Sequence, residues 1–208
     1  MYFIGIYPTI GAPFSLTYFT AAIVPVILIQ LWAVIYLIDP YKYEKSYYLF
    51  FGVYGIVNTF VFFLAIQKFL YFHMGATGVM PFIISVILFT SLLLGVNWMN
   101  WKALYTGTYH KLQQKTSIPV SWLAIGGVGY VLGQIILSFI YTDSGFYTLM
   151  IICISILSLF TAFISVNIHK YFYISKNMDL VKQVYPEFGL PKSERYIKNK
   201  KRKKRGKK

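Results

Sequence analysis

Long apolar stretches separated by short polar segments dominate the chain. Five runs contain no formal charge, and each is long enough for a membrane span; they cover residues 1–38, 46–67, 69–101, 116–142 and 144–169. A helix needs about 20 mainly apolar residues to cross a hydrocarbon core about 30 Å thick. The pattern therefore predicts an all-α membrane protein, a five-helix transmembrane bundle within residues 19–168. Its spans are expected near 19–38, 48–70, 79–98, 120–141 and 147–168.

The first 18 residues form a separate apolar segment. Residues that disfavour a regular helix interrupt it at Gly5, Pro8, Gly11 and Pro13. It also lacks the basic N-terminal region of a signal peptide. We expect residues 1–18 to be an extracytoplasmic lead-in that is interfacial or re-entrant, with a sixth, short span as the alternative.

Composition supports this class of protein. Hydrophobic residues make up 57% of the 208 residues and charged residues only 12%, whereas soluble domains carry about 25% charged residues. A soluble fold of this size could not bury so much apolar surface. The single cysteine, Cys153, lies within the last predicted span and excludes an intrachain disulfide.

Basic residues lie on alternate sides of the predicted spans. The loops at 73–77 and 142–145 contain no Lys or Arg, and Lys68 near the end of the second span is a mild exception. The other loops and the tail carry Lys42, Lys45, Lys102, Lys111, Lys115 and Lys170. Because cytoplasmic loops are enriched in Lys and Arg, we expect the N-terminus outside and the C-terminus in the cytoplasm.

Glycines mark the expected helix contacts. Gly126, Gly129 and Gly133 share one face of the fourth predicted span, and the last two form a GxxxG step. Small residues let helix backbones approach closely in a bilayer, so we expect a tight intramolecular crossing there. Homodimerisation or docking onto another subunit is the alternative. Gly52 and Gly55 indicate a similar contact in the second span.

The uncharged polar residues within the spans include Gln30, Asn58 and Gln134. They are expected to form hydrogen bonds between helices, or to line a neutral polar path. No acidic residue, arginine or histidine lies near the middle of a span, which argues against an ion-coupled transporter.

No catalytic, cofactor-binding or metal-binding constellation is recognisable. The six acidic residues lie in loops and in the tail, and His73, His110 and His169 are isolated from one another. His169 follows Cys153 by 16 residues, about 24 Å along one helix, so the two cannot form a nucleophile–base pair. We therefore predict no cofactor, no metal ion and no enzymatic activity.

The segment after the last span divides into two parts. Residues 169–190 form a juxtamembrane segment, in which apolar residues at helical spacing predict one amphipathic helix over 172–185 that ends before Pro186. Residues 191–208 contain 11 of the 20 basic residues and one acid, which is typical of a disordered tail. Anionic lipid headgroups are its expected contacts, through Lys200, Lys201, Arg202, Lys203, Lys204 and Arg205. Docking onto a protein, or contact with nucleic acid or the ribosome, are alternatives.

Together these features predict a non-enzymatic, multi-pass protein of a bacterial cytoplasmic membrane that acts through helix packing with a partner. The partner is expected to be another membrane protein or a second copy of the chain. Suitable roles are an accessory subunit of a secretion or transport complex, or a membrane immunity or stabilising factor. The alternative is a small transporter or channel for a neutral or lipid-like solute, and an intramembrane enzyme is a third reading.

Overall fold

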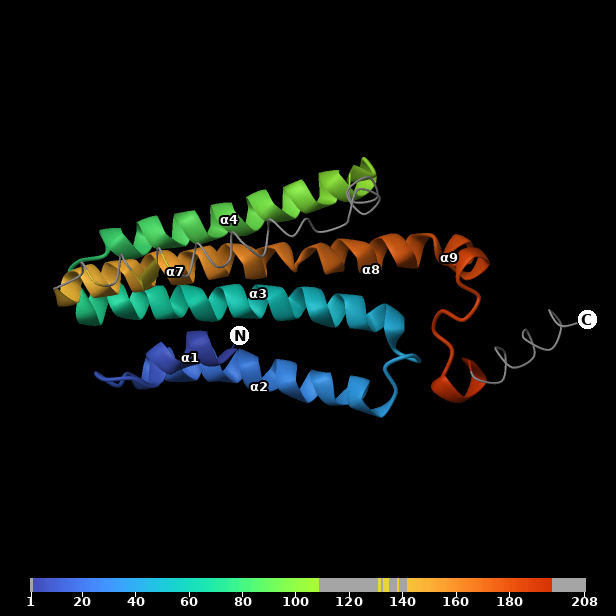
Figure 1. The fold of residues 1–208 in the computed structure, drawn as a ribbon, viewed down its shortest axis with the longest axis horizontal. Helices are drawn as coiled ribbons and strands as arrows, with labels where there is room; N and C mark the ends of the chain where they lie inside the picture. The colour runs from blue at the N-terminus through green and yellow to red at the C-terminus, as the bar shows by residue number, and fades with distance from the viewer. Residues whose placement is uncertain (1, 109–130, 132, 135–137, 139–141, 196–208) are drawn as a thin grey trace, which may run out of the picture.

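The computed structural model describes residues 2–108, 131, 133, 134, 138 and 142–195. The long elements are the helices α2 (Leu16–Ile38), α3 (Glu44–Lys68), α4 (Met80–Tyr105) and α7 (Asp143–Phe163) (Figure 1). Shorter elements are α1 (Tyr2–Ile10), the π-helical turn η1 (Phe69–His73), α8 (Val166–Lys176) and α9 (Met178–Val184). The described part of the chain contains no β-strand.

Within the described residues, four helical stretches are long and apolar enough to cross a membrane. They are Leu16–Ile38, Glu44–His73, Met80–Tyr105 and Asp143–Lys176. The prediction of a helical, apolar membrane protein is confirmed at this level. The remaining predicted span, 120–141, lies almost entirely outside the described residues.

The helix α3 lies at the centre of the bundle. In the most apolar window of Glu44–His73, 50% of residues are buried, against 6% in the window of Met80–Tyr105. α3 packs against α1, α2, α7 and α8, and Figure 1 shows it between α2 and α7. Among the described helices, α3 is therefore the central one, whereas α4 lies at the edge.

The lead-in segment forms the short helix α1 on the flank of the bundle. Its nine residues measure about 13 Å, less than half the length that a bilayer span requires. Ile6 joins a buried cluster with Ala22, Val26 and Val61. Gly5 permits this packing, because a Cβ at Gly5 would lie 2.6 Å from the Val61 Cγ1 atom. Figure 1 shows α1 beside only part of α3.

The last described span is interrupted between α7 and α8. Hydrogen bonds of three-residue spacing replace the α-helical ones here, since Ile164 N donates to Thr161 O and Ser165 N donates to Ala162 O. α8 then continues to Lys176, and a second break follows at Asn177, whose φ of −119° and ψ of 35° leave the helical region. Residues 172–185 thus do not form the single amphipathic helix that the periodicity predicts.

Candidate functional site

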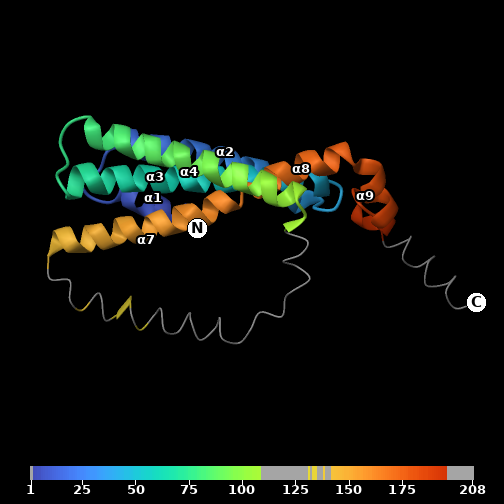
Figure 2. The same ribbon diagram turned by 90° about the horizontal axis from the view of Figure 1, so that it is seen from above.

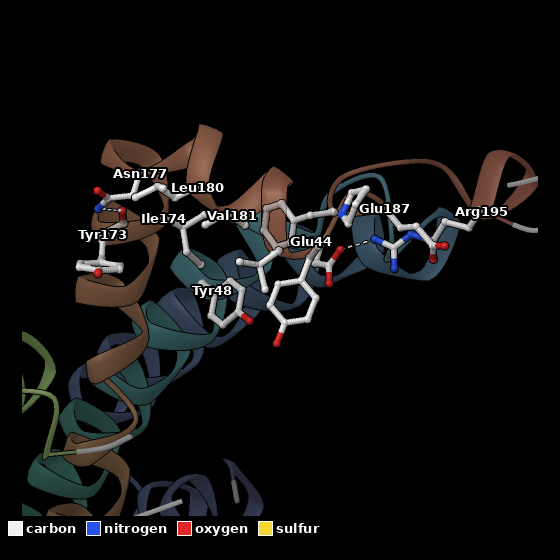
Figure 3. Close-up of a pocket in the computed structure, with 13 residues that line it drawn as sticks. Glu44, Tyr48, Tyr173, Ile174, Asn177, Leu180, Val181, Glu187 and Arg195 are labelled. Carbon is white, nitrogen blue, oxygen red and sulfur yellow. Dashed lines mark hydrogen bonds and ion pairs between the residues drawn. The ribbon is translucent and has the colours of Figure 1, made fainter. Parts of the chain in front are cut away.

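A cavity of about 800 Å³ lies where α8 is followed by α9 (Figure 3). Its walls come from the start of α3, the end of α8, α9, residues 185–188 and Arg195. We call it the α9 cavity, and the end of the bundle that carries it the α9 end. Since segments far apart in the chain build it, only the tertiary fold brings its residues together.

One wall of the α9 cavity is apolar and exposed. Leu180 and Val184 are four residues apart, which places them on the same face of α9. Their exposed fractions are 58% and 69%, and that of the adjacent Tyr185 is 66%. Large apolar side chains that gather at the mouth of a cavity are typical of an interaction surface.

The lining of the α9 cavity also contains a charged contact. The Glu44 carboxylate accepts a hydrogen bond from the Arg195 guanidinium, and both side chains are partly buried, with exposed fractions of 34% and 19%. Gly189 N donates to Glu44 Oε2 at 3.4 Å, and Arg195 Nε donates to Leu190 O at 3.1 Å. Figure 3 shows the Glu44 carboxylate directed at the guanidinium. The Tyr41 ring lies beneath the guanidinium, 4.6 Å from ring centroid to Cζ.

Local backbone structure brings Arg195 to Glu44. Gly189 has a φ of +75°, a conformation that glycine adopts without the steric cost of a Cβ. After it, Glu194 N and Arg195 N both donate to Pro191 O and close a helical turn. The predicted disorder over 191–208 is therefore wrong for its first residues, which the contact with Glu44 holds in place. Residues 196–208, with the six expected lipid-binding residues 200–205, lie outside the described part of the chain.

Small residues and hydroxyl groups join α3 to α7 and α8. A Cβ added at Gly52 would lie 2.5 Å from Ile168 Cγ1, and one at Gly55 would lie 2.7 Å from Thr161 O. Near this crossing the Thr59 and Thr161 hydroxyl oxygens are 3.0 Å apart. The close approach predicted for the two glycines is confirmed, and an interhelical hydrogen bond lies beside it.

The glycine face predicted on the fourth span is only partly visible. Gly126 and Gly129 lie outside the described residues. Gly133 is described, and a Cβ added there would meet no described atom within 4 Å. The expected tight crossing at these glycines therefore stays a prediction.

The three residues of the expected polar path have different surroundings. Gln30 and Gln134 are exposed, whereas Asn58 is buried with 1% of its surface exposed. Asn58 Nδ2 donates to Tyr54 O within its own helix at 2.8 Å. No interaction among the described residues joins these three side chains.

Lys68 is a buried residue whose role the sequence did not indicate. Its side chain is fully buried, and its Nζ donates to Thr9 O at 3.1 Å and to Gly11 O at 2.6 Å. These carbonyls lie at the C-terminal end of α1, where the helix dipole favours a cation. Within the described ranges Lys68 has no carboxylate partner. A lone lysine inside a long apolar stretch was the available signal.

The histidines and acidic residues that the structure describes do not cluster. Over the described residues, no three His, Cys, Asp or Glu side chains are placed to hold a metal ion. His169 Nε2 lies 3.2 Å from Asn97 Oδ1, and the His73 ring stacks on Tyr147 with centroids 4.3 Å apart. Both contacts join neighbouring helices.

Comparison with known proteins gives no match to a family model, to a curated protein or to a solved structure.

Proposed function

We propose that this chain is a non-enzymatic, multi-pass membrane protein that binds a partner membrane protein at the α9 cavity. The observation that carries the proposal is the open cavity itself, whose lining combines the exposed apolar residues of α9 with the Glu44 carboxylate. An amphipathic segment with apolar residues and a basic residue complements both walls. An accessory subunit of a secretion or transport complex, or an immunity or stabilising factor, acts through such a contact.

The proposed topology has five spans, with the N-terminus outside and the α9 end in the cytoplasm. Its support is the direction of two helices: α4 and α7 run the same way along the bundle (Figures 1 and 2). The end of α4 and the start of α7 therefore lie at opposite ends of the bundle, and the apolar stretch 120–141 has the length of a span that would connect them.

Charge supports the orientation. Lys42 and Lys45 lie in or beside the loop between α2 and α3, and Lys102 lies in the last turn of α4. All three belong to the α9 end, together with Lys170 in α8. An excess of lysine marks the cytoplasmic side, and a bacterial cytoplasmic membrane is the proposed location.

The proposed topology places the polybasic tail beside the inner leaflet. Lys200, Lys201, Arg202, Lys203, Lys204 and Arg205 then contact anionic headgroups, each contributing about 1 kcal/mol. A synthetic peptide of residues 191–208 should bind vesicles that contain phosphatidylglycerol and not vesicles of phosphatidylcholine alone. Equal binding to both would contradict this role.

Site-specific photo-crosslinking in the native cell tests the proposed function. A photoreactive amino acid at Leu180, in the α9 cavity, should give one discrete protein adduct. The same group at Ile87 of α4, which is similarly exposed at 59%, is the control and should label lipid. Val184→Asp should abolish the Leu180 adduct because it places a charge on the apolar wall. Lipid labelling alone at both positions would refute the proposal.

A further inference from the structure

We infer that Arg195 occupies the place in the α9 cavity that an arginine of the partner takes when the partner binds. Residues 178–195 therefore act as an autoinhibitory strap. This inference rests on the proposed function, since it names the partner's chemistry and the regulation of the same site. The expected occupant is an arginine-bearing, amphipathic segment of another membrane protein, which displaces the chain's own Arg195.

The strap is held at two separated places. At its beginning, the break at Asn177 joins α9 to α8. At its end, the Arg195 guanidinium and the Gly189 amide both reach one carboxylate, that of Glu44 on α3. Between these places lies the cavity. A segment that is held at both ends over a cavity is released when the contact at one end breaks. A competing cation can break the ion pair at Glu44.

The receptor surface for Arg195 belongs to the bundle. Glu44 begins α3, and Tyr41 lies in the loop before it. Together they offer a carboxylate that accepts a hydrogen bond from the guanidinium and an aromatic ring over which its Cζ atom lies, 4.6 Å from the ring centroid. An aromatic ring combined with a directed hydrogen bond suits arginine better than lysine, whose ammonium is a compact point charge. This geometry specifies an arginine on the incoming segment.

Charge in the cavity favours a cationic occupant over an anionic one. Among the described residues, its lining contains two carboxylates, Glu44 and Glu187, and one cation, Arg195. The formal charge of this described lining is therefore −1 with Arg195 in place and −2 once Arg195 leaves. An anionic lipid headgroup would be repelled by the opened site, whereas an arginine restores the original balance. The exposed Leu180 and Val184 lie on α9, the part of the strap that stays joined to α8 when the contact at Glu44 breaks, and they take the apolar residues of the same segment.

A peptide supplied in trans tests this arrangement. The probe is a fluorescent peptide of residues 186–195, PEFGLPKSER, with blocked ends; its two acids and two bases cancel, so it lacks a net-charge attraction. The receptor is the full chain in phosphatidylcholine nanodiscs. Binding to the unmodified chain should be weak, because the chain's own strap competes at an effective concentration near millimolar. Arg195→Ala in the chain should tighten peptide binding about tenfold or more, because the chain's strap then loses the free energy of one charge-assisted hydrogen bond to Glu44.

Matched variants decide the result. A chain with both Arg195→Ala and Glu44→Gln should lose the tighter binding, and so should a peptide with Arg195→Ala offered to the single variant. A peptide with Arg195→Lys should bind more weakly than the original. Equal binding by the single and the double variant would overturn the inference, as would equal binding of the peptide with and without its arginine.

The outcome is separable from that of the proposed function. If the Leu180 cross-link to a protein forms but the peptide never distinguishes the variants, the strap is refuted and partner binding stands. If the peptide behaves as expected but no protein adduct forms in the cell, the strap is a property of the chain and the proposed function fails.

Discussion

Replacing Lys68 with methionine should release α1 from the bundle. The substitution keeps an unbranched side chain of similar length and removes the ammonium that donates to Thr9 O and Gly11 O. These two bonds join residues that lie 59 and 57 positions apart in the chain. Because α1 has only nine residues, they form a large part of what holds it in place.

The size of the effect follows from two opposing contributions. A hydrogen bond to a charged group contributes about 1.5 to 3 kcal/mol, and the variant loses two of them. Against this, burial of the ammonium costs several kcal/mol in the native protein, and that cost disappears with the charge. We expect the packing of α1 against the bundle to lose about 1 to 3 kcal/mol of stability. The fraction of molecules in which α1 has left its site then rises roughly 5- to 150-fold.

Maleimide labelling of a cysteine at Ile6 measures this opening. Ile6 is buried, with 9% of its surface exposed, so it reacts only when α1 leaves its site. The exposed Cys153 is first replaced by alanine. Labelling of Ile6→Cys in nanodiscs should accelerate within the predicted range when Lys68→Met is added. Lys42→Met is the matched control, because it removes the same charge from an exposed loop residue.

Two results would refute this reasoning. Unchanged labelling in Lys68→Met would show that the ammonium contributes nothing to the position of α1. Equal acceleration in Lys68→Met and Lys42→Met would show an effect of net charge and not of the two carbonyl contacts.

Three further predictions concern helix contacts and the strap. Gly55→Ala should destabilise the protein by about 1 to 3 kcal/mol in detergent unfolding, because its Cβ would lie 2.7 Å from Thr161 O. The control Gly95→Ala, whose Cβ would meet nothing within 4 Å, should stabilise the protein by about 0.4 to 1 kcal/mol. Equal effects of the two substitutions would contradict the close helix crossing at Gly55. Gly189→Ala in the full chain should tighten binding of the unmodified 186–195 peptide. A φ of +75° costs a residue with a Cβ about 1 to 2 kcal/mol, so the substitution weakens the chain's own strap as a competitor. Unchanged peptide binding would count against the strap. A double-mutant cycle of Thr59→Val and Thr161→Val should give a coupling of about 0.6 kcal/mol, and additivity would exclude their hydrogen bond.

The class of protein and most of the described helices were predictable from the amino-acid pattern alone. Placing a charge in hydrocarbon is so unfavourable that the positions of Lys and Asp mark where each apolar helix can begin and end. The expected spans at 19–38 and 79–98 therefore lie within or next to Leu16–Ile38 and Met80–Tyr105. The close packing at Gly52 and Gly55 was predictable for a similar reason, because only small side chains let two backbones meet.

The contacts between residues far apart in the chain were visible only in the tertiary structure. Lys68 looked like a residue at the end of a span, and only the folding of α1 against α3 supplied the carbonyls that allow its burial. Arg195 looked like one more base in a polar tail, and only the turn at Gly189 brought it 151 positions back to Glu44. Hydrophobic periodicity is a local property of the chain, whereas these partners are set by the path of the backbone through space.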